Sequence, residues 1–202
     1  MDFMNIIKGR RTIRKYKQDR IDPKILKDLA DGARLAPSGA NLQPLEYLIV
    51  DDPTLLDKVF DTLAWAGYIK PEGDPKVGER PVAYIIILVK DKARGNTSHD
   101  AGAAIQNILL GAWGYGIGCC WIGSVKRDVL AKEFSIPKDM KIDSVISLGY
   151  PAEESIWEDE KGSIKYYYDE DKVLHVPKRK PEDIIHLNRM TIGVGNPGMD
   201  IS

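Results

Sequence analysis

The chain has 202 residues, of which 43% are hydrophobic and 29% are charged, so it holds enough apolar material for one domain with a sizeable core. Its formal net charge is -1, which excludes a bulk electrostatic attraction to nucleic acid or to an anionic membrane. The two cysteines, Cys119 and Cys120, are adjacent and match neither a zinc knuckle nor a redox C-x-x-C motif. We therefore expect reduced thiols in a reducing cytosol.

No segment of the sequence has the pattern of a targeting or spanning element. The N-terminal residues lack the long apolar stretch and the small-residue cleavage site of a signal peptide. The longest apolar run, residues 82–89, is too short to cross a bilayer as a helix. We therefore expect a cytoplasmic protein that binds neither a membrane nor nucleic acid.

Apolar periodicity and turn residues predict an alternation of helices and strands. In the first half we expect, in chain order, a helix over residues 2–9, a basic extended segment over 10–16, a helix over 22–36, a polar loop over 37–44, a strand over 46–50, a helix over 53–66 and a loop over 67–81. In the second half we expect a strand over 82–89, a helix over 99–113, a strand over 119–122, a helix over 126–134, a strand over 143–148 and a helix over 182–187. With no internal repeat and no second core, one α+β domain is the simplest organisation.

Three segments carry further expectations. The helix over 99–113 is apolar nearly all round, which predicts a core helix that also packs against a second subunit. Residues 152–172 are acidic and then aromatic, and we interpret them as a surface excursion, with a role as a lid left open. The domain is expected to cover residues 1–187, and the Gly-rich tail, 188–202, is expected to be either disordered or wrapped around a partner subunit.

Two basic clusters and one glycine motif are candidates for phosphate binding. In an extended chain Arg10, Thr12 and Arg14 share one face, which would suit a phosphate, although a solvated basic surface explains the same pattern. The cluster at residues 178–180 could converge on the same group. The Gly-x-Gly-x-Gly motif at 114–118 follows a helix and precedes a strand, which is the reverse of the order in a Rossmann dinucleotide site.

A thiol site is a weaker alternative. Either cysteine, together with His99 and Asp100, could form a nucleophilic site, as in a cysteine hydrolase, but nothing in the spacing specifies it. The three histidines lack the spacing of metal ligands, so we expect no metal site.

Taken in order, six motifs resemble those of the flavin-dependent nitroreductase family over about residues 3–187. They are residues 10–14 (RRTIR), 36–44 (APSGANLQP), 100–110 (DAGAAIQNILL), 116–123 (GIGCCWIG), 148–151 (LGYP) and 178–181 (KRKP). The resemblance implies an α+β fold with a central, mostly antiparallel sheet flanked by helices. It also implies an intertwined homodimer with two FMN molecules at its interface and ping-pong chemistry.

The resemblance further implies a set of FMN-binding residues. Arg10 and Thr12 with Lys178 and Arg179 would hold the phosphate, and Arg14 would lie near the pyrimidine end of the ring. The complete expected set is Arg10, Arg11, Thr12, Arg14, Pro37, Ser38, Asn41, Gln43, Trp121, Ile122, Gly123, Gly149, Lys178 and Arg179. Within it, the loop residues from 37 to 43 would come from the other subunit, Ile122 and Gly123 would lie beside the flavin N5, and Gly149 would let the backbone pass close to the cofactor. No protein side chain is expected to be catalytic, because the flavin carries the chemistry.

The expected function is that of a flavoprotein oxidoreductase, which takes hydride from NADH or NADPH and reduces nitroaromatics, quinones, free flavin or a similar small-molecule electron acceptor. Two alternatives stay open within the resemblance. One is a specialised enzyme, such as a dehalogenase or a flavin-fragmenting enzyme, and the other is a flavin-holding protein without turnover. The adjacent cysteines are less usual beside a flavin, and we assign them no catalytic role.

Overall fold

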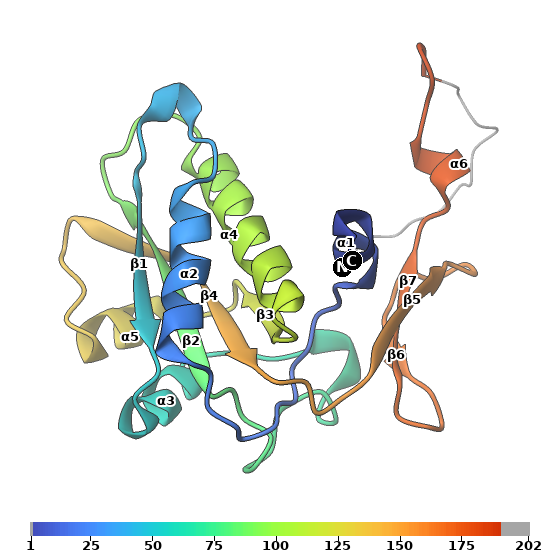
Figure 1. The fold of residues 1–202 in the computed structure, drawn as a ribbon, viewed down its shortest axis with the longest axis horizontal. Coiled ribbons are helices and arrows are strands. Elements are labelled where there is room, and N and C mark those ends of the chain that lie inside the picture. Colours follow the sequence, from blue (N-terminus) through green and yellow to red (C-terminus); the bar gives the residue numbers. More distant parts are fainter. Residues whose placement is uncertain (1, 191–202) are drawn as a thin grey trace.

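A computed structural model describes residues 2–190, which form helices, one main sheet and a small second sheet (Figure 1). The helices are α1 (Phe3–Gly9), α2 (Pro23–Arg34), α3 (Pro53–Phe60), α4 (Thr97–Gly114), α5 (Arg127–Glu133) and α6 (Pro181–Ile184), with short 3-10 turns η1 (Gly39–Asn41) and η2 (Gly67–Ile69). The strands are β1 (Leu45–Val50), β2 (Ala83–Lys90), β3 (Gly118–Ile122), β4 (Met140–Gly149), β5 (Ser155–Asp159), β6 (Tyr167–Tyr168) and β7 (Leu174–Lys178). Within the described residues, no helix has the length and apolar character needed to cross a membrane.

The main sheet has the strand order β1-β2-β4-β3, and all three pairings are antiparallel. Its central strand β2 alternates between two cores because successive side chains point to opposite faces. Ile85 and Ile87 pack with α2 and α4 on one face, whereas Tyr84 and Ile86 pack with α3 and α5 on the other. The sheet therefore lies between two helical layers, which confirms the predicted α+β class with a central antiparallel sheet (Figure 1).

Helix α4 is the longest helix among the described residues, and it packs closely against α2. Ile105 and Ile108 are fully buried, and a Cβ at Gly111 would lie 3.0 Å from a methyl carbon of Leu29. The predicted core role of this helix is confirmed, because its side chains dominate the larger hydrophobic core. Its polar exceptions, Gln106 and Asn107, are exposed, and the Asn107 side chain donates to the Gly32 carbonyl of α2 at 2.9 Å.

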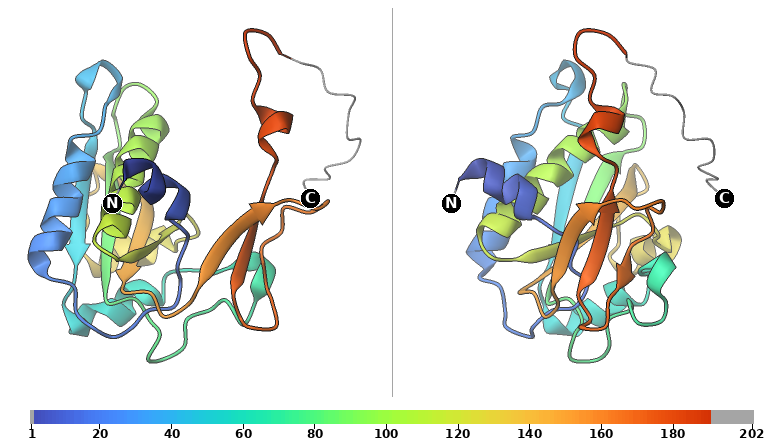
Figure 2. Two further views of the ribbon diagram at one scale, coloured as in Figure 1. Left: turned by 45° about the vertical axis from the view of Figure 1, so that its right-hand side comes forward. Right: turned by 90° about the vertical axis from the view of Figure 1, so that its right-hand side faces the viewer.

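The second sheet has the order β5-β7-β6, with β5 parallel and β6 antiparallel to β7. It stands beside the main layers, and α6 extends beyond it (Figure 2). These strands were not predicted, and two of them, β5 and β6, turn part of the proposed excursion at 152–172 into sheet. The alternation signal is weak here because most of these side chains are either exposed or only partly buried, and because β7 contains Pro177.

One helix ends earlier than the sequence predicts. The expected helix over 53–66 ends at Phe60, because the chain then pairs with the segment before α5. Leu63 forms a β-bridge with Val125, and the backbone N–H of Ala64 donates to the carbonyl of Ser124 at 3.0 Å. The last helix ends at Ile184 rather than 187. Most of the predicted tail, residues 191–202, lies outside the described residues.

Candidate functional site

The segment after α1 forms one wall of a cavity of about 320 Å³. It runs alongside β3, where Thr12 bridges Cys119 and the backbone N–H of Ile13 donates to the Cys119 carbonyl at 3.0 Å. Ile13 is buried, and it can pack there only because position 118 is glycine, since a Cβ on Gly118 would lie 2.7 Å from the Cβ of Ile13. The cavity is lined by Arg10, Thr12, Arg14, Gln106, Leu109, Cys119, Cys120 and Trp121.

Three cations gather beside this cavity without an anion to neutralise them. Burial lowers the pKa of Arg10, and burial together with the charge of Arg10 lowers the pKa of Arg11. Burial also lowers the pKa of Lys178, with further lowering by the charges of Arg11 and Arg10. Within residues 2–190 none of the three forms an ion pair, and the Arg11 Nε is buried without an acceptor. This donor set fits a phosphate group, which would supply both the charge and the acceptors.

Arg179 lies close to this cation cluster in sequence but has a different partner. Its guanidinium donates to the carbonyl of Asp183 in α6 at 3.0 Å. Lys178 and Arg179 were both expected to bind the phosphate. Of the two, only Lys178 has a pKa that is lowered by the charges of Arg10 and Arg11. The role of Arg179 stays a prediction.

Arg14 is held in place by residues that the sequence pattern did not single out. The backbone N–H groups of Arg14 and Lys15 donate to the carboxylate of Glu153, which also accepts from the Tyr168 hydroxyl at 2.8 Å. The Arg14 guanidinium lies 5.1 Å from the ring centroid of Tyr166, within the range of a cation–π contact. Residues 152–172 therefore support the pocket. The acidic and aromatic composition of this segment was the only sequence signal for that role.

The two cysteines are buried thiols rather than nucleophiles. Burial raises the pKa of the Cys119 thiol far above its ordinary value and that of Cys120 to about 11, so both are protonated at neutral pH. His99 pairs with Asn96, and Asp100 accepts hydrogen bonds from the 38–39 segment, so neither makes a hydrogen bond to a cysteine. The geometry does not support a cysteine-hydrolase site. Nor does any cluster of three or more metal-binding side chains occur among the described residues.

Replacing both cysteines by alanine is therefore expected to leave flavin binding intact and to change turnover by no more than about 3-fold, because no thiolate is available to react. Flavin absorbance of the purified variant and its steady-state rate with NADH measure the two effects. A variant that retained its flavin but lost turnover would contradict this assignment and give a thiol a chemical role.

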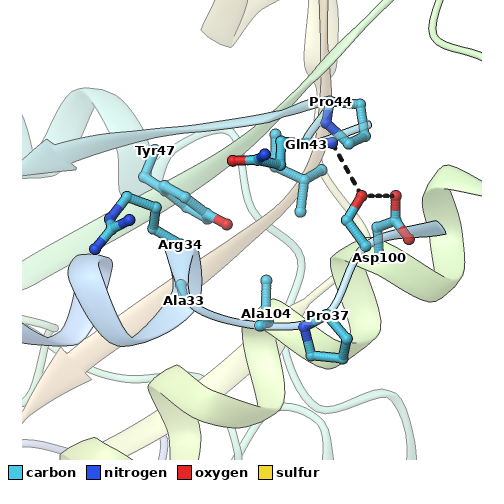
Figure 3. A pocket seen from close by; sticks show the side chains of 11 residues that line it. Ala33, Arg34, Pro37, Gln43, Pro44, Tyr47, Asp100 and Ala104 are labelled. Atoms are coloured by element: carbon cyan, nitrogen blue, oxygen red, sulfur yellow. Dashed lines mark hydrogen bonds between the residues drawn. The ribbon is translucent and has the colours of Figure 1, made fainter. Parts of the chain in front are cut away.

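The loop from Pro37 to Gln43 forms a separate polar site beside the first turn of α4 (Figure 3). The Ser38 hydroxyl donates to one carboxylate oxygen of Asp100 at 3.0 Å, and the Gly39 N–H donates to the other at 2.9 Å. The Gln43 N–H in turn donates to the Ser38 hydroxyl at 3.0 Å. Cavities of about 130 and 400 Å³ lie on the two sides of this loop. Asp100 lies far from this loop in sequence, so no local pattern links the two.

Helix α4 keeps this loop away from the basic cavity. Asp100 lies next to the loop, while Leu109 lines the cavity. They are nine residues apart, so at about 100° and 1.5 Å per residue they lie on opposite sides of the helix and roughly 14 Å apart along it. Within one chain, the expected cofactor residues therefore form two half-sites that face different directions.

The remaining expected residues lie around β3 and β4. Trp121 lines the basic cavity and is 46% exposed. Ile122 is buried in a cluster with Trp65, and a Cβ on Gly123 would meet no atom within 4 Å. A Cβ on Gly149 would lie 2.7 Å from Tyr16, so this glycine makes room for a buried tyrosine of its own chain. The proposed cofactor contacts of Ile122, Gly123 and Gly149 stay predictions.

Comparisons of the sequence and of the structure with known proteins both find proteins described as nitroreductases. Residues 7–150 match the model of a family described as "Nitroreductase family". A protein of Methanothermobacter thermautotrophicus named "Putative NADH dehydrogenase/NAD(P)H nitroreductase" is 31% identical over 159 residues, which cover 76% of this chain and 79% of the relative. A structure from Bacteroides thetaiotaomicron described by the same name has a TM-score of 0.66 and 26% identity, covering 93% of this chain and 98% of the other. A nitroreductase-fold structure from Desulfovibrio desulfuricans, solved in complex with FMN, has a TM-score of 0.64 and 24% identity, covering 76% and 88%.

Proposed function

The chain belongs to the nitroreductase family, and from that premise we propose that it is a homodimeric, FMN-dependent oxidoreductase that passes hydride from NADH or NADPH to a small electron-poor acceptor. The observation that carries the proposal is the cluster of Arg10, Arg11 and Lys178, which lacks an anion within residues 2–190 and lies beside an open cavity. A phosphate monoester would complete it.

Different residues in and beside the cavity would bind different parts of FMN. Arg10, Arg11 and Lys178 would bind the phosphate by charge-assisted hydrogen bonds, and the Thr12 hydroxyl would add one more. When bound, FMN supplies the chemistry by accepting a hydride at N5 and passing it on, so the protein needs no acid or base of its own. Arg14 would place a cation near the pyrimidine end of the ring, where it favours the negative charge that reduction creates.

A second subunit would complete each site. The 37–43 loop and the basic cavity face opposite sides of α4, so one FMN molecule meets both only if the loop comes from a partner. Apolar surface near the chain ends supports an interface: α1 buries none of its side chains, with Phe3 61% exposed, and Ile185 and Leu187 after α6 are 69% and 86% exposed. We propose a homodimer in which these apolar segments pack against the partner.

The proposed acceptors are nitroaromatics, quinones and free flavin, which are planar and electron-poor. The nicotinamide and the acceptor would use the same open side of the flavin in turn, which is a ping-pong mechanism. The exposed Trp121 ring at the cavity offers a flat apolar surface for such molecules.

Steady-state kinetics test this proposal. We expect double-reciprocal plots against NADH or NADPH to stay parallel when a quinone or a nitroaromatic compound is varied, because each substrate reacts with a different state of the enzyme. Intersecting lines would contradict the shared site. Flavin reduction by the nicotinamide without turnover on any nitro compound or quinone would favour a specialised enzyme of the family, and a bound flavin that neither nicotinamide reduces would indicate a flavin-holding protein.

A further inference from the structure

Asp100 is a buried carboxylate whose hydrogen bonds are all directed at one loop. Its side chain lies in the first turn of α4, and its residue is 9% exposed. One oxygen accepts from the Ser38 hydroxyl at 3.0 Å (Figure 3). The other accepts from the Gly39 N–H at 2.9 Å. Burying a carboxylate is unfavourable unless its acceptor sites are used, so this arrangement fixes the start of the loop on the helix.

The loop that Asp100 holds has a strained backbone. Three of its residues other than glycine, Ala40, Asn41 and Gln43, have φ values of 48°, 56° and 47°, in the left-handed region that L-residues rarely adopt. Such conformations persist only where surrounding contacts impose them, and they concentrate at functional sites. The loop is held by the two hydrogen bonds to Asp100, by the bond from the Gln43 N–H to the Ser38 hydroxyl, and by backbone bonds from Asn41 and Leu42 to the carbonyls of Ser38 and Gly39. Of these, only the bonds to Asp100 fix the loop to another element.

The same bonds determine what the Ser38 hydroxyl can offer to a cofactor. Its single hydroxyl proton is donated to Asp100, so this hydroxyl has no proton left to donate to a cofactor. The Asn41 side chain, by contrast, makes no hydrogen bond to residues 2–190 and is exposed at the tip of the loop. Of these two polar side chains of the loop, Asn41 is therefore the one with donors free for a ligand.

We propose that Asp100 is a positioning residue, which holds the 38–43 loop in its strained form through Ser38 and Gly39 and so presents the Asn41 side chain to the FMN of the partner subunit. This inference rests on the proposed function, and it assigns the preorganisation of the loop to one buried carboxylate. Loss of that carboxylate would let the loop relax, and FMN binding would then have to restore the strained form.

The test is the FMN dissociation constant of the apoprotein, measured by quenching of flavin fluorescence. We expect Asp100→Ala and Ser38→Ala to raise it by about 10- to 100-fold, since each removes hydrogen bonds of a buried charged group. Asp100→Asn is expected to change it by less than about 5-fold, because the amide oxygen still accepts from Gly39 and its NH₂ group can donate to Ser38. Asp128→Ala, which removes an exposed aspartate from the first turn of α5, is the matched control and should leave the constant unchanged.

A double-mutant cycle separates positioning from a purely structural effect. If Asp100 acts through Asn41, the combined Asp100→Ala and Asn41→Ala variant should raise the dissociation constant by clearly less than the product of the single effects. Multiplicative effects, or an unchanged constant in both Asp100→Ala and Ser38→Ala, would overturn the inference while leaving the proposed function in place. Failure of the unchanged protein to bind FMN would instead overturn the proposed function and this inference with it.

Discussion

Replacing Arg10 by alanine is expected to raise the FMN dissociation constant by about 30-fold or more, so that the variant is purified without flavin. Arg10 lies beside Arg11 and Lys178, and within residues 2–190 it has no ion-pair partner of its own, so the FMN phosphate would be its main partner. Breaking one partner of a desolvated charge pair costs roughly 2–5 kcal/mol, and each 1.4 kcal/mol is tenfold in affinity. Fluorescence titration of the apoprotein with FMN measures the change.

Two further variants test whether the loss of FMN affinity is specific to the guanidinium of Arg10. Arg10→Lys keeps the charge but loses the planar fork of donors, and an intermediate loss of affinity is expected. Arg20→Ala is the matched control, because Arg20 is exposed and lines neither the basic cavity nor the cavities beside the 37–43 loop. If Arg10→Ala bound FMN as tightly as Arg20→Ala, the phosphate could not be bound by this cluster.

Mixed dimers are expected to recover about half of the FMN sites when two inactive subunits are combined. One subunit carries Arg10→Ala, and the other carries Asn41→Ala together with Gln43→Ala. If each site takes Arg10 from one subunit and the loop from the other, one site of the mixed dimer receives both defects and the other receives none. Flavin content of dimers isolated through two different affinity tags measures the recovery.

The alternative arrangement gives a different result. If Arg10 and the loop of the same chain served one flavin, both sites of the mixed dimer would carry one defect, and no flavin would be recovered. Homodimers of each variant, prepared in parallel, set the baseline. If the mixed dimer held no more flavin than these homodimers, the FMN site could not combine Arg10 of one subunit with the loop of the other.

Much of the fold could be predicted because the signals are local. The apolar, β-branched run that forms β2 and the all-round apolar character of α4 identify buried elements without knowledge of their neighbours. Alternation in an extended chain likewise predicts that Arg10, Thr12 and Arg14 share a face, and all three line one cavity.

The rest depends on contacts between residues far apart in the chain. The parallel pairing of β5 with β7 leaves little trace in either strand, since most of their side chains are either exposed or only partly buried. Asp100 was considered only for a thiol site and Glu153 for no site, because each acts on a backbone segment distant in sequence. Gly149 shows the same limit: its sequence context does not reveal that its missing side chain makes room for Tyr16, and its contact with a cofactor stays a prediction.

The visible absorption spectrum of the purified protein, recorded before and after anaerobic addition of NADH and then NADPH, tests whether the protein holds a flavin that a nicotinamide reduces. We predict a yellow protein, or one that becomes yellow when reconstituted with FMN, whose flavin bands bleach with at least one nicotinamide. A colourless protein that cannot be reconstituted with FMN, or a bound flavin that neither nicotinamide bleaches, would contradict the account.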